Sequence, residues 1–304
     1  MAKILLAGGA GFMGKILAGH FAGKDDEVII LTRGSDKIED GIKYVNWDGA
    51  NIGRWAMELE GSDVLINLTG KNVNCRYNEE NKSEIFGSRL KATRALGYAL
   101  KALKSPPPVW INAASSTVYR HAEDRPQDEY TGEIGTGFSV EVCKQWEAAF
   151  FEQKIPGVRQ IVLRTAIVLG RNGGVMPYYF NLAKFGLGGK QGNGRQYFSW
   201  IYEDDVIGII EFLIAHHQLQ GVFNVASTCP VQNAALMRTV RHEMHVPFGI
   251  PVTKYMLKAG AWLLGTETEL ILKSRWVLPA RLTDAGYKFK VTDINRAIHL
   301  CRPV

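Results

Sequence analysis

The sequence predicts an α/β protein with a doubly wound parallel sheet and a smaller C-terminal lobe. Short strands and helices alternate regularly through the first half of the 304 residues. The strands are apolar along their whole length, which is typical of a parallel sheet that helices cover on both faces. A glycine-rich turn, GGAGFMG, joins the first strand to the first helix.

The order of the elements follows from these patterns. Strands are expected at residues 3–6, 27–32, 43–47, 63–68, 109–113 and 158–168, and helices at 12–21, 88–103 and 141–153. The strand segments are short and rich in Val, Ile and Leu, whereas the helix segments are longer and carry an apolar face. Further along, GVFNVAS at 221–227 is typical of a strand that returns to the same sheet.

Composition and charge exclude several classes of protein. Hydrophobic residues make up 46% of the chain and charged residues 22%, as in an ordinary globular domain. The net charge of +6 comes from Lys and Arg scattered among Asp and Glu, without the basic run of a nucleic-acid-binding protein. We therefore expect a small-molecule, anionic ligand and no nucleic-acid partner. The oligomeric state stays open.

The cysteines and the termini indicate where the protein works. Four cysteines, Cys75, Cys143, Cys229 and Cys301, lie far apart without CxxC spacing, so free thiols are expected. The apolar N-terminus ends in glycines and lacks a signal-peptide cleavage site. The apolar stretch at 256–265 contains Lys258 and is too short to cross a bilayer. These features predict a cytoplasmic protein with no membrane partner.

The glycine turn predicts a dinucleotide site of the Rossmann kind. Gly8, Gly11 and Gly14 are spaced three apart after the first strand. The first glycine permits a sharp turn, the second lets the backbone approach a pyrophosphate, and the third permits close packing of the helix on the sheet. Phe12 and Met13 lie at the start of the helix, whose free N–H groups face the phosphates.

The end of the second strand favours NADP over NAD. An acidic residue at this point would bind the ribose 2′-hydroxyl of NAD. The sequence instead has Arg33, which could pair with a 2′-phosphate, with Ser35 or Lys37 assisting. Asp36 lies close by and leaves NAD as the alternative cofactor.

Several longer segments carry a family resemblance. They run in order along nearly the whole chain and include NLTG, SSTVY, NEENKSEIFGSRLKATRAL, WEAAF, LRTAIVLGRNGGVMP, GLGGKQGNGRQYFSWIYEDDV, PVQNAALMRTV and VLPARLTDAGYKF. They resemble the extended short-chain dehydrogenase/reductase superfamily. More narrowly, they resemble its atypical epimerase-like family, which is similar to NAD-dependent epimerases and dehydratases and ends in a small conserved C-terminal domain.

The resemblance implies roles for residues at three strand ends. Leu68, Thr69 and Gly70 would line the ribose and nicotinamide side of the cofactor. Ser115 matches the catalytic serine that holds a substrate oxygen, with Ser116 as the alternate. Trp200 and Asp205 match a conserved stretch that we expect to fix a loop and to cap the following helix.

A polar set lies around the expected start of the long helix. Arg76, Ser88 and Arg89, together with Lys82, could anchor an acidic group of a substrate. The alternative is a solvated helix surface with ion pairs between neighbouring turns.

The catalytic Tyr–Lys pair of the superfamily is missing. None of the eleven tyrosines has a lysine four residues later. Counted back from Glu147, the two positions fall on Ser139 and Cys143, or on Val140 and Lys144. The resemblance implies that this absence is common in the family, whose substrates are not established.

Three explanations follow from the missing pair. Another acid could move the proton, with Tyr119 as the first candidate and Tyr178, Tyr179 and Glu129 as others. Cys143 could act, although a buried structural thiol is the simpler reading. Or the protein could bind NADP without redox chemistry.

These observations give the functional prediction. We expect residues 1–172 with about 199–227 to form the NADP-binding domain, and 173–198 with 228–304 to form a substrate lobe. The function expected is an NADP-dependent oxidoreductase or epimerase acting on a small polar substrate, a nucleotide sugar being one candidate; the alternative is a non-catalytic NADP-binding regulator or scaffold. No metal is expected, because His242 and His245 have no third ligand nearby.

Overall fold

The protein is organised around an eight-stranded, mostly parallel sheet. In the computed structural model, which describes residues 1–258 and 267–302, the strand order is β12-β7-β6-β5-β1-β2-β4-β3. The strands are β1 (Lys3–Ala7), β2 (Glu27–Thr32), β3 (Lys37–Glu39), β4 (Ile42–Asn46), β5 (Val64–Asn67), β6 (Val109–Ser115), β7 (Arg159–Thr165) and β12 (Gly221–Val225). Only β3 runs antiparallel to its neighbour. The predicted doubly wound fold is therefore confirmed.

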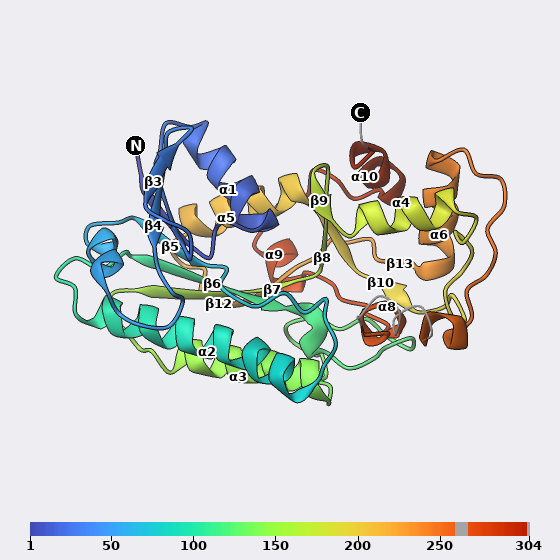
Figure 1. Cartoon of the computed structure of the whole chain (residues 1–304), viewed down its shortest axis with the longest axis horizontal. Coiled ribbons are helices and arrows are strands. Elements are labelled where there is room, and N and C mark those ends of the chain that lie inside the picture. The colour runs from blue at the N-terminus through green and yellow to red at the C-terminus, as the bar shows by residue number, and fades with distance from the viewer. Residues whose placement is uncertain (259–266, 303–304) are drawn as a thin grey trace.

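Helices cover both faces of this sheet (Figure 1). One face packs on α1 (Phe12–Ala22) and α5 (Glu203–Ala215), and the other on α2 (Glu79–Lys101) and α3 (Phe138–Phe151). Residues alternate between the two cores along each strand: Ile4 and Leu6 enter the first core, Leu5 and Ala7 the second. All four side chains are apolar because neither face of the sheet meets water.

The sequence placed the strands well and one helix poorly. The predicted strand 27–32 coincides with β2, and 221–227 contains β12, which pairs with β7 in the main sheet. The predicted helix 88–103 begins nine residues too late. Asn78 caps α2 by accepting a hydrogen bond from the Asn81 N–H, and Glu79 and Glu80 occupy the first turn. This capping signal was present in the sequence.

A second body of structure follows β7. It contains β8 (Ile167–Gly170), β9 (Gly173–Gly174), α4 (Met176–Lys184), β10 (Tyr197–Phe198), β11 (Trp200–Tyr202), β13 (Val231–Gln232), α6 (Asn233–Glu243), α8 (Glu269–Leu272), α9 (Ala280–Asp284) and α10 (Ile294–Leu300). The helices α4, α6 and α10 lie on the right-hand side of Figure 1. A separate hydrophobic core joins them to β11. In the chain, β8 to β11 of this body precede β12 of the main sheet, and β13 to α10 follow it.

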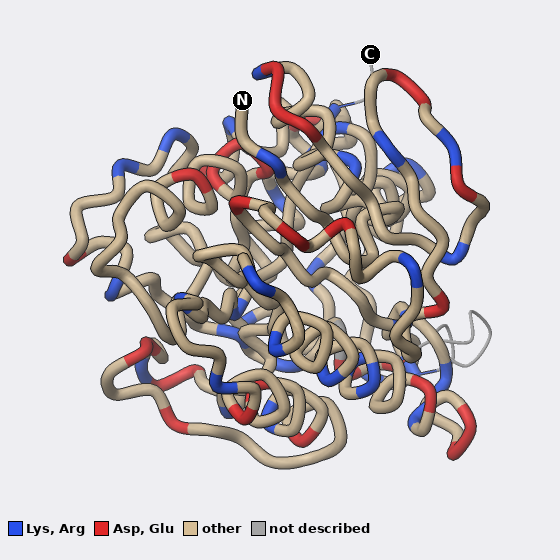
Figure 2. The backbone as a smooth tube through the Cα atoms, turned by 90° about the vertical axis from the view of Figure 1, so that its left-hand side faces the viewer, with Lys and Arg blue, Asp and Glu red and all other residues tan. Residues whose placement is uncertain are grey.

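Two remaining expectations concern charge and membranes. Figure 2 shows Lys and Arg interspersed with Asp and Glu along the chain. Among the described residues no helix has both the length and the apolarity that a membrane crossing requires. Most of the apolar stretch at 256–265 lies outside the described residues.

A buried carboxylate fastens the C-terminal segment to α5. Asp205 is fully buried and accepts hydrogen bonds from the Lys290 N–H (2.7 Å), the Val291 N–H (2.9 Å) and the Tyr287 hydroxyl (3.1 Å). The sequence predicted that Asp205 caps the helix. Its oxygens instead bind the C-terminal segment, and α5 has no side-chain cap. Trp200 meets its expectation of fixing a loop, since its indole N–H donates to the Cys229 carbonyl at 3.0 Å.

Replacing Asp205 should therefore cost stability. We expect Asp205→Ala to lower the free energy of unfolding by about 3 kcal/mol, because three donors lose a buried acceptor at once. Asp204→Ala is the matched control, since Asp204 is the exposed neighbour in the same helical turn. Urea unfolding of both variants measures the difference. Equal stabilities would show that Asp205 does not hold the segment.

Candidate functional site

The carboxyl ends of three adjacent strands form the candidate site. β1 pairs with β5, and β5 pairs with β6, all in parallel, so the loops that follow them meet at one edge. These strands end at Ala7, Asn67 and Ser115, so the edge brings together Gly8, Thr69 and Ser115. Gly8 has φ +73°, and a Cβ on it would lie only 2.8 Å from the Thr69 Cα atom. Only glycine permits this close approach of two loops.

The other two glycines of the turn differ in their surroundings: Gly14 is closely packed, whereas Gly11 faces open space. A Cβ on Gly14 would lie 2.1 Å from the Gly9 carbonyl oxygen, so Gly14 is required for packing. A Cβ on Gly11 would meet nothing within 4 Å, and Gly11 begins α1 without a side-chain cap. Unoccupied backbone donors at a helix start with open space before them suit a phosphate group.

The side chains of Phe12 and Met13 pack within the protein. A Cβ on Gly173 would lie 2.5 Å from the Phe12 ring, so this ring packs on the β8–β9 turn. Met13 packs against the core of the sheet. Only the backbone N–H groups of these two residues remain for a ligand.

The Thr69 hydroxyl is the clearest indication of a ligand-binding position at this edge. It is buried and is one of three buried side-chain atoms in the described part of the chain that have no hydrogen-bond partner. The Thr69 N–H donates to Asn67 Oδ1 at 3.0 Å, and Asn67 in turn donates to Asn112 at 2.7 Å. The loop is therefore held firmly while its hydroxyl is left without a partner, as a cofactor site requires.

The residues expected to bind the cofactor after β2 differ in whether their side chains already have partners within the protein. Arg33 and Ser35 are exposed in this loop, and no described acidic residue forms an ion pair with Arg33. Lys37 lies in β3, where it pairs with Glu39 at 2.7 Å. The Asp36 carboxylate accepts a hydrogen bond from the Asn46 N–H at 2.6 Å. Arg33 and Ser35 are thus the expected cofactor residues of this loop whose side chains stay exposed, and Arg33 is the charged one.

Ser115 and Ser116 differ in accessibility. Ser115 is half-buried at the end of β6, and its hydroxyl accepts a hydrogen bond from the Thr117 N–H at 3.2 Å. The Ser115 hydroxyl hydrogen is free to be donated. Ser116 is 2% exposed. Of the two, only Ser115 is partly exposed.

Tyr119 belongs to a buried polar network. Its hydroxyl donates to Asn224 Oδ1 and accepts from Arg164, both at 3.0 Å, and burial raises its pKa. Arg164 forms a bidentate salt bridge with Glu147, and each of its two hydrogen bonds is 2.8 Å long. Glu129 joins the same network by accepting from the Asn224 N–H at 2.8 Å. The Tyr119 hydroxyl therefore has two partners inside the protein.

On α3, the residues at the positions of the Tyr–Lys pair take part in contacts within the protein. The Ser139 hydroxyl donates to Glu269 at 3.0 Å. Cys143 is buried, and burial raises the pKa of its thiol to about 11. Lys144 lies on the outer face and pairs with Glu141 at 2.9 Å. No phenol takes the usual place on α3.

Arg89 lies on α2 against the loop that follows β5. Because α2 begins at Glu79, the expectation that Ser88 and Arg89 mark the start of the helix was wrong. A Cβ on Gly70 would lie 2.9 Å from the Arg89 guanidinium carbon, which also stacks 5.0 Å from the Trp146 ring. Burial lowers the pKa of Arg89, and no described carboxylate forms an ion pair with it.

The other members of the polar set serve the helix itself. Ser88 accepts from the Lys71 N–H at 2.9 Å and donates to the Ile85 carbonyl, so it joins the Thr69–Lys71 loop to α2. Lys82 pairs with Glu79 at 2.8 Å. The carbonyl of Arg76 accepts from Asn81 at 2.8 Å. Only Arg89 of this set lies against Gly70.

Sequence reasoning missed two cations that the fold brings to the site. Lys273 donates to the Thr117 carbonyl at 2.7 Å, and Arg275 donates to the Thr117 hydroxyl at 3.2 Å. Both side chains therefore contact the turn that follows Ser115. Their spacing of two residues in an extended segment places them on one side of the chain, which was the available signal. Within the described residues, no group of His, Cys, Asp and Glu could hold a metal ion.

The environment of Cys143 gives a test of this geometry. We expect iodoacetamide at pH 8 to label exposed Cys229 readily and to leave Cys143 unlabelled, because the buried thiol stays protonated well above that pH. Mass spectrometry of the native protein measures both sites, and urea-unfolded protein is the control. Equal labelling of the two in the native state would contradict the burial of α3.

Known proteins resemble the chain in sequence. The profile of the NAD dependent epimerase/dehydratase family matches residues 4–226, and a domain of unknown function, DUF1731, matches 252–299. The mouse epimerase family protein SDR39U1 is 30% identical over 302 residues, covering 97% of this chain and 98% of the mouse protein. Epimerase family protein SAR0825 of Staphylococcus aureus is 31% identical over 303 residues, covering 98% of each chain.

Solved structures resemble it in fold. The human epimerase family protein SDR39U1, solved with NADPH, has a TM-score of 0.85 and 28% identity, with 98% of each chain covered. A nucleoside-diphosphate sugar epimerase from Corynebacterium glutamicum has a TM-score of 0.79 and 28% identity, covering 99% of this chain and 58% of the other. The predicted resemblance is confirmed: the chain belongs to the NAD dependent epimerase/dehydratase family and ends in a DUF1731 domain.

Proposed function

We propose that the protein is an NADP-binding, epimerase-like oxidoreductase that acts on a small polar substrate. The observation that carries the proposal is the convergence of the open backbone at Gly11, the unpartnered Thr69 hydroxyl and the Ser115 hydroxyl at one sheet edge. A relative of similar fold was solved with NADPH, which supports the choice of cofactor. NADP, when bound, would supply or accept a hydride.

The cofactor contacts are assigned by element. The backbone of the β1–α1 turn would hold the pyrophosphate, through Gly8, Gly11, Phe12, Met13 and Gly14. The loop after β5 would hold the nicotinamide ribose through Leu68, Thr69 and Gly70. Arg33 would bind the 2′-phosphate, with Ser35 beside it; Lys37 would assist only if it left Glu39. NAD remains the less favoured alternative, because Asp36 is already bound by the Asn46 N–H.

Two half-buried side chains, Ser115 and Arg89, would orient the substrate. Ser115 would donate its hydroxyl hydrogen to a substrate oxygen, and Ser116 is the alternate. Arg89 would hold an acidic group near Gly70; Arg76 and Ser88 would act through the loops around it. Tyr119 is a weak candidate for the proton donor, since its hydroxyl is bound to Asn224 and Arg164.

We further propose that residues 1–172 with about 199–227 bind the cofactor, and that 173–198 with 228–304 form a lobe over the substrate. The contacts of Lys273 and Arg275 with Thr117 support this division, since they bring that lobe to the end of β6. The free thiols support the proposal that the protein works in the reducing cytoplasm.

A second function is favoured by one observation. The helix α3 offers no phenol, and its Cys143 thiol stays protonated at neutral pH. A protein that binds NADP and signals its presence to a partner needs neither group. Such a regulator or scaffold would keep the cofactor site and lose hydride transfer.

The role of Arg33 can be tested by cofactor preference. We expect Arg33→Ala to weaken NADPH binding about tenfold or more and to leave NADH binding within about twofold, because only NADPH carries the 2′-phosphate. Calorimetric titration of both cofactors gives the constants. Arg54→Ala, at a second exposed arginine near this loop, is the control. Equal losses for NADPH and NADH in Arg33→Ala would reject this role.

The role of Ser115 can be tested without knowing the substrate. NADPH carrying deuterium at C4 is incubated with the protein and a metabolite extract, and mass spectrometry detects any deuterium-labelled product. We expect Ser115→Ala to reduce labelling at least about 100-fold while NADPH still binds. Ser116→Ala should retain labelling. If wild-type protein gives no labelled product, the regulator is favoured. If Ser116→Ala loses labelling and Ser115→Ala keeps it, the role belongs to Ser116.

A further inference from the structure

Two exposed phenylalanines lie at one end of the molecule. The chain has thirteen phenylalanines, all within the described residues, and only Phe185 and Phe248 are exposed, at 76% and 81%. Phe185 follows α4 and Phe248 follows α6, and Figure 1 shows these two helices at the end away from β3 and β4. A phenylalanine ring gains free energy when it leaves water, so two exposed rings in one region indicate a contact surface.

Backbone hydrogen bonds hold the two segments side by side. The Ile250 N–H donates to the Gly186 carbonyl at 2.8 Å, and the Gly189 N–H donates to the Ile250 carbonyl at 3.2 Å. A Cβ on Gly189 would lie 2.5 Å from the Ile250 carbonyl carbon, so this close approach needs a glycine. Residues 184–190 and 248–258 therefore form one surface, which we name the apolar turn surface.

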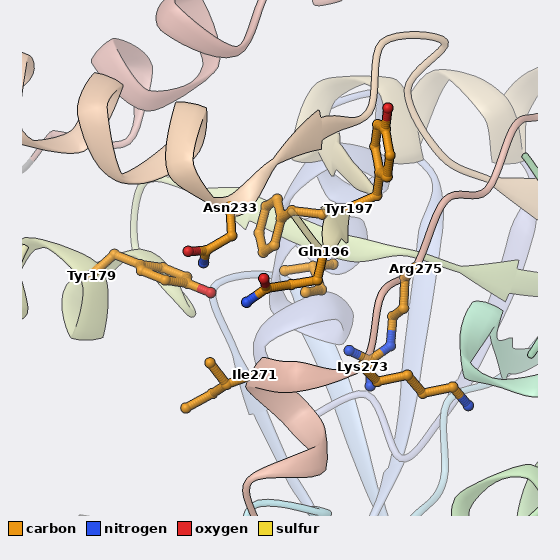
Figure 3. Close-up of a pocket in the computed structure, with 9 residues that line it drawn as sticks. Tyr179, Gln196, Tyr197, Asn233, Ile271, Lys273 and Arg275 are labelled. Carbon is orange, nitrogen blue, oxygen red and sulfur yellow. The ribbon is translucent and has the colours of Figure 1, made fainter. Parts of the chain in front are cut away.

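Further large side chains extend the apolar turn surface. Three of them are exposed in its second segment: Ile250, Tyr255 and Met256. Tyr178 is exposed on α4 and precedes Phe185 by seven residues, or about two helical turns, so the two lie on the same face of the helix. The neighbouring Tyr179 instead lines a small cavity inside the lobe (Figure 3). The outer face of α4 is thus aromatic where a solvated helix would be polar.

The charge of the apolar turn surface has one sign. Neither of its two segments contains Asp or Glu. Its four lysines are exposed, and none forms an ion pair with a residue that the structure describes: Lys184, Lys190, Lys254 and Lys258. Glu243 in α6 is already engaged by His299 at 3.1 Å and by Arg302 at 3.5 Å. Unpaired lysines therefore flank exposed apolar side chains in both segments.

We propose that the apolar turn surface docks the protein on an anionic lipid bilayer. The rings of Phe185 and Phe248 would enter the boundary between headgroups and acyl chains, while the lysine ammonium groups stay at the lipid phosphates. A peripheral contact of this kind needs no helix that crosses the membrane. It revises the sequence-based expectation of no membrane partner, which rested on the lack of a membrane-crossing segment.

The charge pattern disfavours a second copy of the chain as the occupant of this surface. A two-fold axis through the surface would bring its lysines toward the same lysines of the other copy, and like charges repel across an interface. A bilayer with anionic lipids instead offers phosphates to every lysine at once, and each lysine near it strengthens binding about fivefold. A fluid lipid layer also accommodates protruding rings without a matching pocket.

Vesicle sedimentation with the full chain tests the proposal. Vesicles of phosphatidylcholine alone are compared with vesicles that also contain about 30% phosphatidylglycerol. We expect the anionic vesicles to bind the protein at least about tenfold more tightly at about 0.1 M salt, and this preference to shrink at about 0.5 M salt, because salt screens the lysines. Equal binding to the two kinds of vesicle, or no binding to the anionic kind, overturns the proposal.

Substitutions of exposed apolar side chains locate the contact. We expect Phe248→Ser to weaken binding to anionic vesicles at least about tenfold, because the ring no longer enters the lipid. Met57→Ser is the matched control, since Met57 is 69% exposed and lies outside the surface. Thermal melting checks that both variants are folded. If Phe248→Ser binds vesicles as tightly as Met57→Ser, the apolar turn surface is not the docking site.

Charge reversal tests the lysines separately. We expect the double variant Lys190→Glu with Lys254→Glu to weaken binding to anionic vesicles at least about 20-fold and to leave binding to phosphatidylcholine within about twofold. Lys154→Glu, at an exposed lysine outside the surface, should lower binding far less. Equal losses for the double variant and Lys154→Glu would show that net charge alone drives binding, which contradicts the proposal.

Hydrogen exchange gives an independent location. Anionic vesicles should slow amide exchange in residues 184–190 and 248–258 and leave α2 unchanged. Protection confined to other segments would overturn the proposal. The apolar turn surface contains none of the residues assigned to the cofactor or to substrate orientation, so Phe248→Ser should bind NADPH like wild type in calorimetry. Loss of NADPH binding by wild-type protein would reject the cofactor proposal and leave the vesicle result standing.

Discussion

The close approach of the Gly8 backbone to Thr69 is the contact on which the candidate site depends. It brings the loop after β1 against the loop after β5, and it is possible only because Gly8 has a positive φ and no side chain. Gly14 makes a similar approach to the Gly9 carbonyl and sets α1 close to the sheet. Together these contacts leave Gly11 open and the Thr69 hydroxyl without a partner, at the edge where open parallel sheets commonly bind ligands.

Buried charge joins this edge to the rest of the molecule. The Glu147–Arg164 pair links α3 to β7 and holds the Tyr119 hydroxyl next to β12. Asp205 joins α5 to the C-terminal segment through three donors. Such groups are costly to bury unless every oxygen is bound, and here each carboxylate has its partners. The segment 273–278 is held against the turn that follows Ser115 by Lys273 and Arg275, which both donate to Thr117.

The structure shows what replaces the missing Tyr–Lys pair on α3 and which other elements bring cations near it. Ser139 turns to Glu269, and Cys143 is a protonated thiol at neutral pH. The positive charge of the crevice comes from other elements, with Arg89 on α2 and Lys273 and Arg275 on the C-terminal segment. The site is thus richer in fixed cations than α3 alone suggests, and it is suited to an acidic ligand.

The fold and the cofactor loops could be predicted from the sequence because their signals are local. Apolar runs specify strands, and the spacing of Gly8, Gly11 and Gly14 reflects backbone needs within one turn. Even the start of α2 had a local signal in Asn78, although the prediction did not use it. The sequence by itself thus determined the doubly wound sheet, the family and the place of the turn.

What only the tertiary structure decided were contacts between distant segments. Thr117 meets Lys273 and Arg275 more than 150 residues later, and Tyr179 and Gln196 line one cavity from different segments (Figure 3). No periodicity records such pairs, because each residue looks like an ordinary polar side chain in its own segment. Burial then decides which of these side chains lack a partner, and burial is a property of the packed chain rather than of its sequence.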